Sequence, residues 1–593
     1  MESYNTRQPL GFGKTMLASA LGFIIGTAAL SMIGILVVAS MLVSAVSSVS
    51  QDPSPVPDNI FVQIDLDRQY CEQPPNELQQ LITSNEFVSL HEITEAIRHA
   101  QTDDKVKGLY LNAADGGRLT WGQCDELRNA IVQFKQSGKP VIAYGNSYSQ
   151  TDYYLASAAD RVILNPAGIV DFRGIAAESI FIKDLAEKLG IRVELIRPGS
   201  NSYKSAGEMY TMTHFSNANR EQIRSYIQGT WDYATSQISQ SRNINSAKLN
   251  TIADNLDGMI ACDALSNQLI DTLAFEHGAH QIIKNIYNAD KTISAHRYAQ
   301  SIQKSTDANK IAIVYAEGDV MVGQADGYNT AVYSETLVEA LDQAAKNQNI
   351  KAIVLRINSP GGAVTASEVI SDAVRRANSQ KPVVVSMGSL AASAGYEIAS
   401  GASTIVAQPI TLTGSIGVFG VVPDFSSLLR DRLGISTDTV CTNNQSAGLS
   451  VTRPLSPKAR AMMQRNVESF YDTFCMRVSQ GRGLDIKTVD SIGRGRVWIG
   501  TDALKLGLVD TLGYLSTAIQ IAAQKADITT YTTVNYPKSQ DLMSQLFGYR
   551  KHKDETQLSA QVNQIIPYYS QLKEWSSMDP MQARLPFIMI GMQ

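Results

Sequence analysis

Hydrophobic and polar residues follow each other along the chain in a pattern that predicts strands alternating with helices. In the C-terminal half, Ala352-Ile-Val-Leu-Arg-Ile357 and Pro382-Val-Val-Val-Ser386 are short apolar runs typical of buried strands. Residues 366–378, between them, carry apolar side chains at helical spacing. Residues 216–240 and 456–481 predict two long helices. Short apolar strands joined by helices indicate β-α-β units and a parallel sheet.

The same order of motifs occurs twice along the chain. Lys139-Pro-Val-Ile-Ala143 matches Lys381-Pro-Val-Val-Val385 at an offset of 242 residues. Asp263-Ala-Leu matches Asp502-Ala-Leu at an offset of 239 residues, in the same order along the chain. Matches in one order at a nearly constant offset indicate two copies of one fold.

An apolar segment near the N-terminus predicts a membrane helix. No charged residue occurs over residues 15–50, and the run over residues 21–43 exceeds the roughly 20 residues that span a bilayer. The alternative is a cleaved signal peptide, whose apolar region would be about 7–15 residues long. Arg7 and Lys14 precede the run, so the positive-inside rule predicts a cytoplasmic N-terminus. We therefore expect a single-pass protein of the inner membrane whose main part is periplasmic if the source is a Gram-negative bacterium.

These features divide the chain into five parts. We expect a cytoplasmic N-terminus and anchor, a Pro-rich stalk, a first repeat, a second repeat and a C-terminal extension, over residues 1–50, 51–58, 59–300, 309–537 and 538–593. The extension resembles neither repeat, and its sequence indicates no role. The expected fold class is α/β, with tandem repeats following an N-terminal transmembrane helix.

Composition narrows the classes of function. The 593 residues are 44% apolar and 18% charged, which suits large buried cores and argues against a disordered chain. A net charge of -5 provides no basic field for nucleic acid. The five scattered cysteines include no CxxC pair and the seven histidines include no HExxH motif, so neither a disulfide framework nor a metal site is predicted.

Three turns rich in small residues follow strand-like runs in the second repeat. In Asn358-Ser-Pro-Gly-Gly362, the glycines would let backbone N–H groups approach a ligand. In Gly388-Ser-Leu-Ala-Ala-Ser-Ala-Gly-Tyr396, small neighbours would leave the hydroxyl of Ser393 approachable. The third turn is Thr411-Leu-Thr-Gly-Ser-Ile-Gly417. Each turn alone is also consistent with close packing and no chemistry.

A serine nucleophile needs a base, and comparison of the repeats points to a lysine. No histidine lies in the three turns. The first repeat has Thr151 at the position of Ser393, whereas the second repeat has Gln445 at the position of Lys204. Burial would lower the pKa of a lysine towards neutrality, so that its amine could accept a proton. The two repeats therefore look complementary, with a surface lysine and a packed serine as the alternative.

The whole set of features resembles the long, two-copy signal peptide peptidases (the protease IV type) of peptidase family S49. The resemblance rests on the anchor, both repeats, the Asn-Ser-Pro-Gly-Gly turn, the Ala-Ala-Ser segment at 391–393 and the Tyr-Lys-Ser-Ala segment at 203–206. It covers nearly the whole chain. It implies tandem Clp-protease/crotonase-like repeats, no metal or organic cofactor, and a homo-oligomer, namely a tetramer.

The resemblance also implies roles for the candidate residues. Ser393 would be the nucleophile, Lys204 the general base, and Ser415, which lies 22 residues beyond the nucleophile, would orient the lysine. The oxyanion hole would be formed by backbone N–H groups of Gly361 or Gly362 and of Ala394. Glycine is common in the family at the position of Ala394. The resemblance therefore does not fix the size of the pocket or the conformation of this turn.

The expected activity is that of a membrane-anchored serine endopeptidase that degrades cleaved signal peptides and other apolar peptides. One rival is a crotonase-type acyl-CoA enzyme, although a domain outside the cytoplasm has no evident supply of acyl-CoA. A second rival is a catalytically inactive scaffold that binds apolar peptides. Serine-directed acylation at Ser393 would distinguish a peptidase from such a scaffold.

Overall fold

The computed structural model describes residues 56–74, 87–289, 291–303, 307–325, 330–538 and 581–584, together with Met16, Gly26 and Met32. The chain forms two compact units, Met1–Val56 and Pro57–Gln593. Most of the first unit, including nearly all of the expected span over residues 21–43, lies outside the described residues. Among the described residues, no helix has both the length and the hydropathy needed to cross a membrane.

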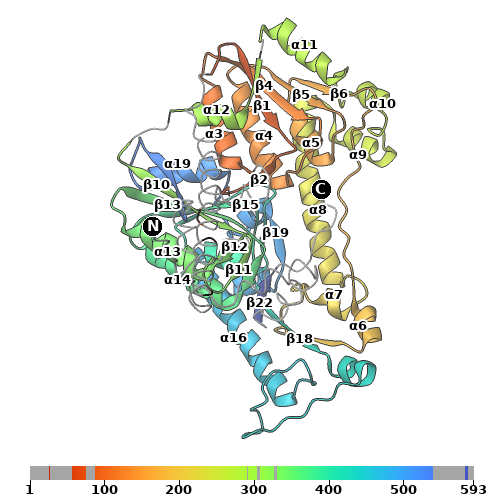
Figure 1. Ribbon diagram of the computed structural model, residues 1–593, viewed down its shortest axis with the longest axis vertical. Coiled ribbons are helices and arrows are strands. Elements are labelled where there is room, and N and C mark those ends of the chain that lie inside the picture. The colour runs from red at the N-terminus through yellow and green to blue at the C-terminus, as the bar shows by residue number, and fades with distance from the viewer. Residues whose placement is uncertain are drawn as a thin grey trace, which may run out of the picture. The chain divides into compact units, whose positions relative to one another are not determined.

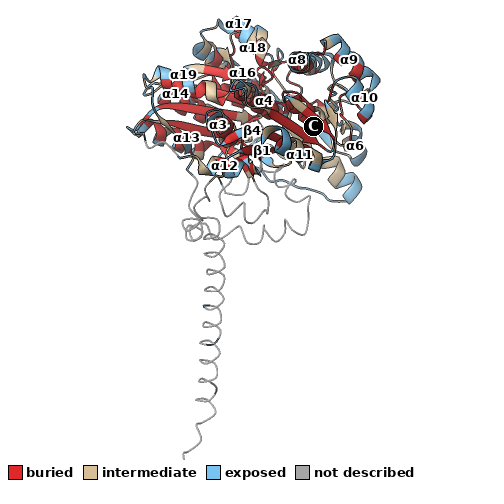
Figure 2. Ribbon diagram, turned by 90° about the horizontal axis from the view of Figure 1, so that it is seen from above, coloured by how far each residue is buried: buried red, intermediate tan, exposed pale blue. Residues whose placement is uncertain are grey.

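The first repeat is built on a parallel sheet with the strand order β8-β6-β5-β4-β1-β9. The strands are β1 (Ile60–Asp65), β4 (Val106–Ala113), β5 (Val141–Gly145), β6 (Arg161–Leu164), β8 (Thr272–Leu273) and β9 (Lys291–Ser294). The helices are α3 (Leu90–Ala100), α4 (Trp121–Lys135), α5 (Gln150–Ala156), α6 (Lys183–Leu189), α7 (Glu208–Thr211), α8 (Asn217–Arg242), α9 (Ser246–Asn255), α10 (Ala261–Ser266), α11 (Glu276–Tyr287) and α12 (Ala295–Ser301). The strands are buried and exposure is concentrated on the outer helices (Figure 2), which explains the continuous apolar runs of the sequence.

The second repeat follows the same plan. Its sheet has the order β19-β17-β15-β13-β10-β21. β16 pairs with β15 and β20 pairs with β16, and the sheet is parallel except where β17 meets β19. The strands are β10 (Lys310–Glu317), β13 (Ile350–Ser359), β15 (Val383–Ala392), β16 (Thr404–Ala407), β17 (Leu412–Gly414), β19 (Val497–Ile499), β20 (Thr511–Leu512) and β21 (Thr532–Tyr536). The helices are α13 (Ser334–Lys346), α14 (Val364–Asn378), α15 (Ala394–Ala399), α16 (Pro457–Arg482), α17 (Ile486–Ile492), α18 (Gly500–Lys505) and α19 (Leu515–Lys525), with a short π-helix, η1 (Leu428–Arg432).

The two long helices that the sequence predicts are present. α8 and α16 have 26 residues each. A serine caps the N-terminus of each helix. The hydroxyl of Ser216 accepts a hydrogen bond from the N–H of Asn219, and that of Ser456 accepts one from the N–H of Ala459. In Figure 1, α8 runs from the first repeat towards β19 of the second, with which it is in contact.

A third sheet joins the two repeats. Its order is β12-β11-β14-β22-β18-β7. The strands are β7 (Arg192–Ile196), β11 (Asp319–Met321), β12 (Ala331–Tyr333), β14 (Gly361–Ala363), β18 (Phe419–Asp424) and β22 (Met581–Arg584); β2 (Gln69–Cys71) and β3 (Phe87–Ser89) form a separate pair. β7 of the first repeat pairs antiparallel with β18 of the second. The glycines that the sequence places in a turn instead form the short strand β14, because they pair with β11 and β22.

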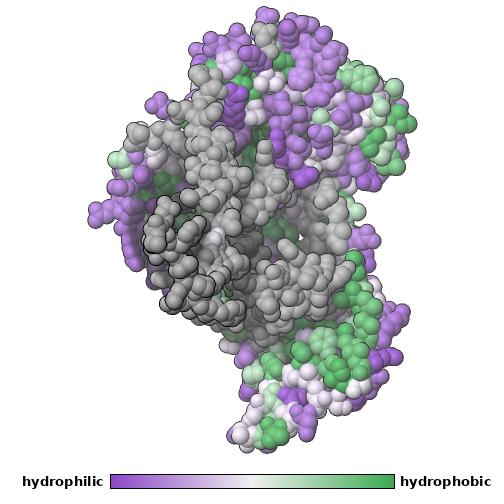
Figure 3. Space-filling view, viewed as in Figure 1, coloured by the Kyte–Doolittle hydropathy of each residue, from purple (hydrophilic) through white to green (hydrophobic). Residues whose placement is uncertain are grey.

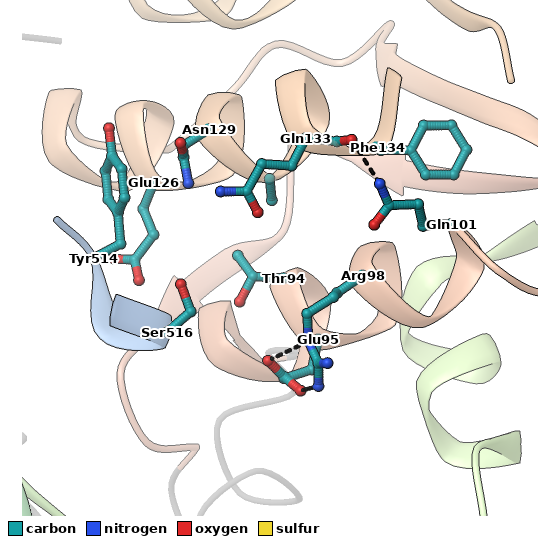
Figure 4. A pocket seen from close by; sticks show the side chains of 11 residues that line it. Thr94, Glu95, Arg98, Gln101, Glu126, Asn129, Gln133, Phe134, Tyr514 and Ser516 are labelled. Atoms are coloured by element: carbon teal, nitrogen blue, oxygen red, sulfur yellow. Dashed lines mark hydrogen bonds and ion pairs between the residues drawn. The ribbon is translucent and has the colours of Figure 1, made fainter. Parts of the chain in front are cut away.

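A buried ion cluster also holds the repeats together. Arg356 on β13 lies with its Nε 2.8 Å from the carboxylate of Glu72 and its Nη2 2.6 Å from that of Glu126, and both acids belong to the first repeat. All three side chains are at most 5% exposed. Glu126 also accepts a hydrogen bond from the N–H of Leu515 at the start of α19. Figure 4 shows Glu126 and Tyr514 beside a cavity of about 30 Å³, which suits a single water molecule.

We predict that Arg356→Met destabilises the protein, because it leaves two buried carboxylates without their cation. Removing one partner of a buried ion pair costs about 3–5 kcal/mol. The matched control is Arg376→Met, since Arg376 also contacts two acids, Asp342 and Asp372, but is about half exposed. Exposed pairs contribute about 0–1 kcal/mol. Thermal melting should show a clear drop only for Arg356→Met, and equal melting temperatures would contradict the prediction.

Candidate active site

Ser393 lies at a sharp turn between β15 and α15. Its backbone has φ 58° and ψ −120°, a conformation that is strained for a residue with a Cβ. The turn is held by two hydrogen bonds, from the Ser393 N–H to the Gly414 carbonyl (2.8 Å) and from the Glu397 N–H to the Ser393 carbonyl (2.9 Å). Strain of this kind costs about 1–3 kcal/mol and persists only where the surroundings impose it. The surroundings therefore fix the direction of the Ser393 side chain.

The small residues around Ser393 allow α15 to pack directly against the end of β13. A Cβ added to Gly395 would lie 3.0 Å from the carbonyl oxygen of Ser359. Ala392 and Ala394, which flank Ser393, are fully buried. The small residues thus allow the close packing of α15, and this packing also holds the Ser393 hydroxyl in place.

Lys204 reaches Ser393 from the other repeat. It lies in the turn between β7 and α7, and its Nζ is 2.7 Å from the Oγ of Ser393. The same Nζ lies 2.9 Å from the Oγ and 3.0 Å from the carbonyl oxygen of Ser415, which follows β17. The structure therefore brings together three sequence-predicted residues from distant parts of the chain.

The surroundings of Lys204 favour its neutral amine. All three side chains of the cluster are 0% exposed. Burial lowers the pKa of Lys204 well below its ordinary value, because desolvation disfavours the ammonium form. The three hydrogen-bond partners of Nζ are neutral oxygen atoms of Ser393 and Ser415. A neutral amine can accept the proton of the Ser393 hydroxyl, which is the property a general base requires.

A segment of the second repeat is hydrogen-bonded to both the Lys204 turn and the Ser415 turn. The N–H of Tyr203 donates to the carbonyl of Arg494 (3.0 Å), and the N–H of Ser415 donates to the carbonyl of Arg496 (2.7 Å). The backbone of residues 494–496 thus links the Lys204 turn to the Ser415 turn. This segment is not among the residues that the sequence predicts for the site.

Gly495 is the tightest point of that contact. Its φ is 81°, and an added Cβ would lie 2.5 Å from both the backbone N and the Cβ of Lys204. Its N–H donates to the carbonyl of Ile416 (2.7 Å). Only glycine fits there without moving Lys204. The single signal in the sequence is the pair of closely spaced glycines, Gly493 and Gly495, ahead of an apolar run.

The candidate oxyanion donors lie on two elements. Ala394 is the first residue of α15, immediately after Ser393, and Gly361 and Gly362 lie on β14, which contacts α15. The N–H of Gly361 donates to the hydroxyl of Ser359 (3.2 Å). Binding an oxyanion at Gly361 would therefore require that hydroxyl to turn away.

The corresponding place in the first repeat is filled by a carboxylate. Gly117 follows β4 as Gly361 follows β13, and its N–H donates to Asp152 (3.0 Å). A Cβ on Gly117 would lie 1.7 Å from a carboxylate oxygen of Asp152, which is next to Thr151. A negative charge already bound at this N–H would repel a developing oxyanion. The first repeat therefore lacks both the serine and an accessible donor at this place.

Other reactive groups give no competing site in the described part of the chain. No three His, Cys, Asp or Glu side chains gather there closely enough to hold a metal ion. The cysteines are free, and Cys71, Cys124 and Cys475 are buried. Burial raises the pKa of the Cys475 thiol to about 12, which disfavours a reactive thiolate.

A family model described as peptidase family S49 matches residues 133–289 and 375–529, one segment in each repeat. The chain belongs to peptidase family S49. A model described as Clp protease matches residues 303–410. These matches confirm the internal repeat and the α/β fold of two Clp-protease-like domains with parallel sheets.

Similar proteins cover most of this S49 chain. Protease 4 of Salmonella typhi is 37% identical over 453 residues, or 74% of this chain and 72% of its own. Protease 4 of Haemophilus influenzae is 33% identical over 458 residues, or 74% and 73%. The chloroplastic serine protease SPPA of Arabidopsis thaliana is 28% identical over 459 residues, or 75% and 67%. The S49 chain is accordingly a serine peptidase of the protease 4 type, which confirms the predicted enzyme class.

We predict that Gly495→Ala lowers kcat of the S49 peptidase by about a hundredfold, because a misplacement of about 1 Å at a catalytic group has an effect of that size. The matched control is Gly483→Ala, since Gly483 also has a positive φ (65°) but has open space where the Cβ would be. The measurement is hydrolysis of a fluorogenic apolar peptide. If both variants have the same kcat, the close contact between Gly495 and Lys204 does not position the lysine.

Proposed function

We propose that this S49 peptidase is a membrane-anchored endopeptidase that degrades cleaved signal peptides and other apolar peptides with a catalytic dyad of Ser393 and Lys204. One observation carries the proposal, namely the 2.7 Å contact between Nζ and Oγ of two fully buried residues from different repeats. A serine hydroxyl beside a neutral amine has the two parts that acyl transfer needs, a nucleophile and its base.

In the proposed reaction, neutral Lys204 takes the proton of Ser393 as Oγ attacks the peptide carbonyl. The resulting oxyanion accepts hydrogen bonds from the N–H of Ala394 and of Gly361 or Gly362, each worth about 3–4 kcal/mol. The ammonium of Lys204 then protonates the leaving amine as the peptide bond breaks. The neutral amine of Lys204 next takes a proton from a water molecule, which attacks the acyl-enzyme. The acyl group leaves as the acid and the Ser393 hydroxyl is regenerated.

Ser415 is proposed to orient the base. Its hydroxyl and carbonyl oxygens both accept hydrogen bonds from Nζ, which leaves the nitrogen lone pair directed at Ser393. The positive φ of Ser415 (52°) and its hydrogen bond to Arg496 fix those two oxygens. Such a fixed pair of acceptors restricts the rotation of a flexible lysine side chain.

The proposed location follows from the apolar run over residues 21–43, which would hold the domain at the periplasmic face of the inner membrane. An anchor in the same bilayer as an apolar peptide raises the frequency of encounter without any added contact. No cofactor enters the proposed steps.

The proposed assembly is a homotetramer. Figure 3 shows hydrophobic side chains gathered over α6 and over the segment after η1. The exposed apolar residues there are Ile180, Leu185, Leu189, Leu433, Ile435, Val440, Leu449 and Val451. A contiguous exposed apolar patch of this kind is typical of a surface that packs against another molecule, and a second copy of the chain is the partner we propose.

We predict that Ser393→Ala and Lys204→Ala each abolish peptide hydrolysis, because each removes one half of the dyad. Ser389→Ala, on the strand that ends just before Ser393, should keep its activity. A serine-directed acylating reagent should label the unaltered chain at Ser393, found by peptide mass spectrometry, and Lys204→Ala should lose that labelling. Unchanged peptide hydrolysis in both Ser393→Ala and Lys204→Ala would contradict the proposed dyad.

We also predict the pH dependence of the reaction. Lys204 acts only when deprotonated, so kcat/KM should rise with pH as its proton is lost. Because burial lowers the pKa of Lys204, the rise should be complete well below the ordinary lysine value of about 10.4. Lys204→Arg should be inactive at every pH, since guanidinium is not deprotonated in proteins. A rise centred near pH 10 would show that the amine is not desolvated.

A further inference from the structure

Helix α8 buries two amide side chains beside the Lys204 turn. Gln222 is 0% exposed and Asn219 is 2% exposed. Glutamine and asparagine are mostly exposed in folded proteins, and a buried amide costs free energy unless its polar atoms are paired. The partners of these two amides therefore show what keeps them at this interface.

The amide of Gln222 contacts both neighbours of Lys204. Its Nε2 lies 3.0 Å from the carbonyl oxygen of Tyr203 and 3.0 Å from the Oγ of Ser205. Its Oε1 accepts a hydrogen bond of 3.2 Å from the N–H of Val497. A carbonyl can only accept and a backbone N–H can only donate, so these partners fix which end of the amide is the nitrogen. One side chain thus joins the residues before and after Lys204 to the second repeat.

The partner of Gln222 in the second repeat belongs to the strand pair that leads to the Ser415 turn. Val497 is the first residue of β19 and is aligned with Gly414 at the end of β17. Ser415 follows Gly414, and its Oγ lies 2.9 Å from the Nζ of Lys204. The amide of Gln222 therefore connects the turn that carries the candidate base with the strands that carry the residue contacting that base.

A second amide holds Gln222 in place. The Oδ1 of Asn219, one turn earlier on α8, lies 3.0 Å from the Nε2 of Gln222. The Nδ2 of Asn219 donates to the carboxylate of Glu208 (3.1 Å), which is also buried. Glu208 begins α7, which follows the Lys204 turn. Contacts on both its nitrogen and its oxygen thus restrict the amide of Gln222 to one orientation.

We propose that Gln222 is a positioning residue for the reaction: its amide holds the backbone on both sides of Lys204, so that Nζ meets Ser393. The inference rests on the proposed function, because this position matters for turnover only if Lys204 is the base. A lysine side chain is a flexible four-carbon stem, so a shift of its backbone is passed on to the amine. Packing alone would not require an amide, since an apolar side chain of similar volume fills the same space without the cost of burying polar atoms.

The test replaces Gln222 with methionine, which has a similar volume and no amide. The matched control is Thr230→Val, because Thr230 is also 0% exposed on α8 but its hydroxyl donates to the carbonyl of Tyr226 in the same helix (3.0 Å). The first readout is the pKa of Lys204, from NMR of protein with labelled lysine side chains. Gln222→Met should raise this pKa towards the ordinary lysine value, because a released turn lets water reach Nζ. Thr230→Val should leave it unchanged.

The substitution of Gln222 by methionine does not alter the charges around the turn. The charged groups there are Arg197, Glu208, Glu221 and Arg496. Both glutamine and methionine are neutral, so a change in the pKa of Lys204 would report its position and hydration.

The second readout is hydrolysis of a fluorogenic apolar peptide. Gln222→Met should lower kcat about a hundredfold, the effect of a misplacement of about 1 Å at a catalytic group. KM should change little, and the rise of kcat/KM with pH should move to higher pH. Ser205→Ala removes one acceptor of the Gln222 amide and should have the same effects, but smaller. It also provides the test if thermal melting shows that Gln222→Met does not fold.

Three results would overturn the inference. The first is an unchanged pKa of Lys204 in both Gln222→Met and Ser205→Ala. The second is an equal change of this pKa in Thr230→Val. The third is a lower kcat with an unchanged pH profile, which a loss of folded protein would also produce. Failure of the proposed function is a separate result, because Lys204→Ala would then still hydrolyse the peptide while Gln222→Met changes the pKa of Lys204.

Discussion

The antiparallel pairing of β7 with β18 is the contact on which the site depends. It takes a strand of the first repeat into a sheet of the second, and the turn after that strand places Lys204 against Ser393. Neither repeat contains both residues. The cluster around Arg356 and the long helix α8 hold the same two bodies together, so the geometry of the site and the stability of the fold share one interface.

Burial at this interface lowers the pKa of Lys204, and the same interface sets its position. The amine of Lys204 is enclosed by neutral oxygens, and the resulting loss of hydration lowers its pKa. The first repeat carries Asp152 where the second has Ala394, and the carboxylate occupies the N–H of Gly117. In the proposed mechanism one site is shared by the two copies, with the candidate base in the first and the candidate nucleophile in the second.

Much of this arrangement can be predicted from local sequence. Apolar runs indicate the strands and helical spacing indicates the helices. Comparison of the repeats points to Ser393 and Lys204, which the structure places in hydrogen-bond contact. The remaining features depend on contacts between distant segments. Gly361 and Gly362 form a strand because of partners from elsewhere in the chain, and the need for Gly495 arises only where Lys204 packs on it. The local sequence shows a glycine at each of these places but not the distant segment that requires it.

The central claim is that the interface holds Lys204 as a neutral amine beside Ser393. The most direct test is NMR of the full-length protein with lysine labelled at the side-chain carbon and nitrogen, using Lys204→Arg to assign the signal that disappears. We expect a Lys204 signal with the chemical shift of a neutral amine, titrating well below the ordinary lysine pKa of about 10.4. A Lys204 signal that titrates together with the exposed lysines would contradict it.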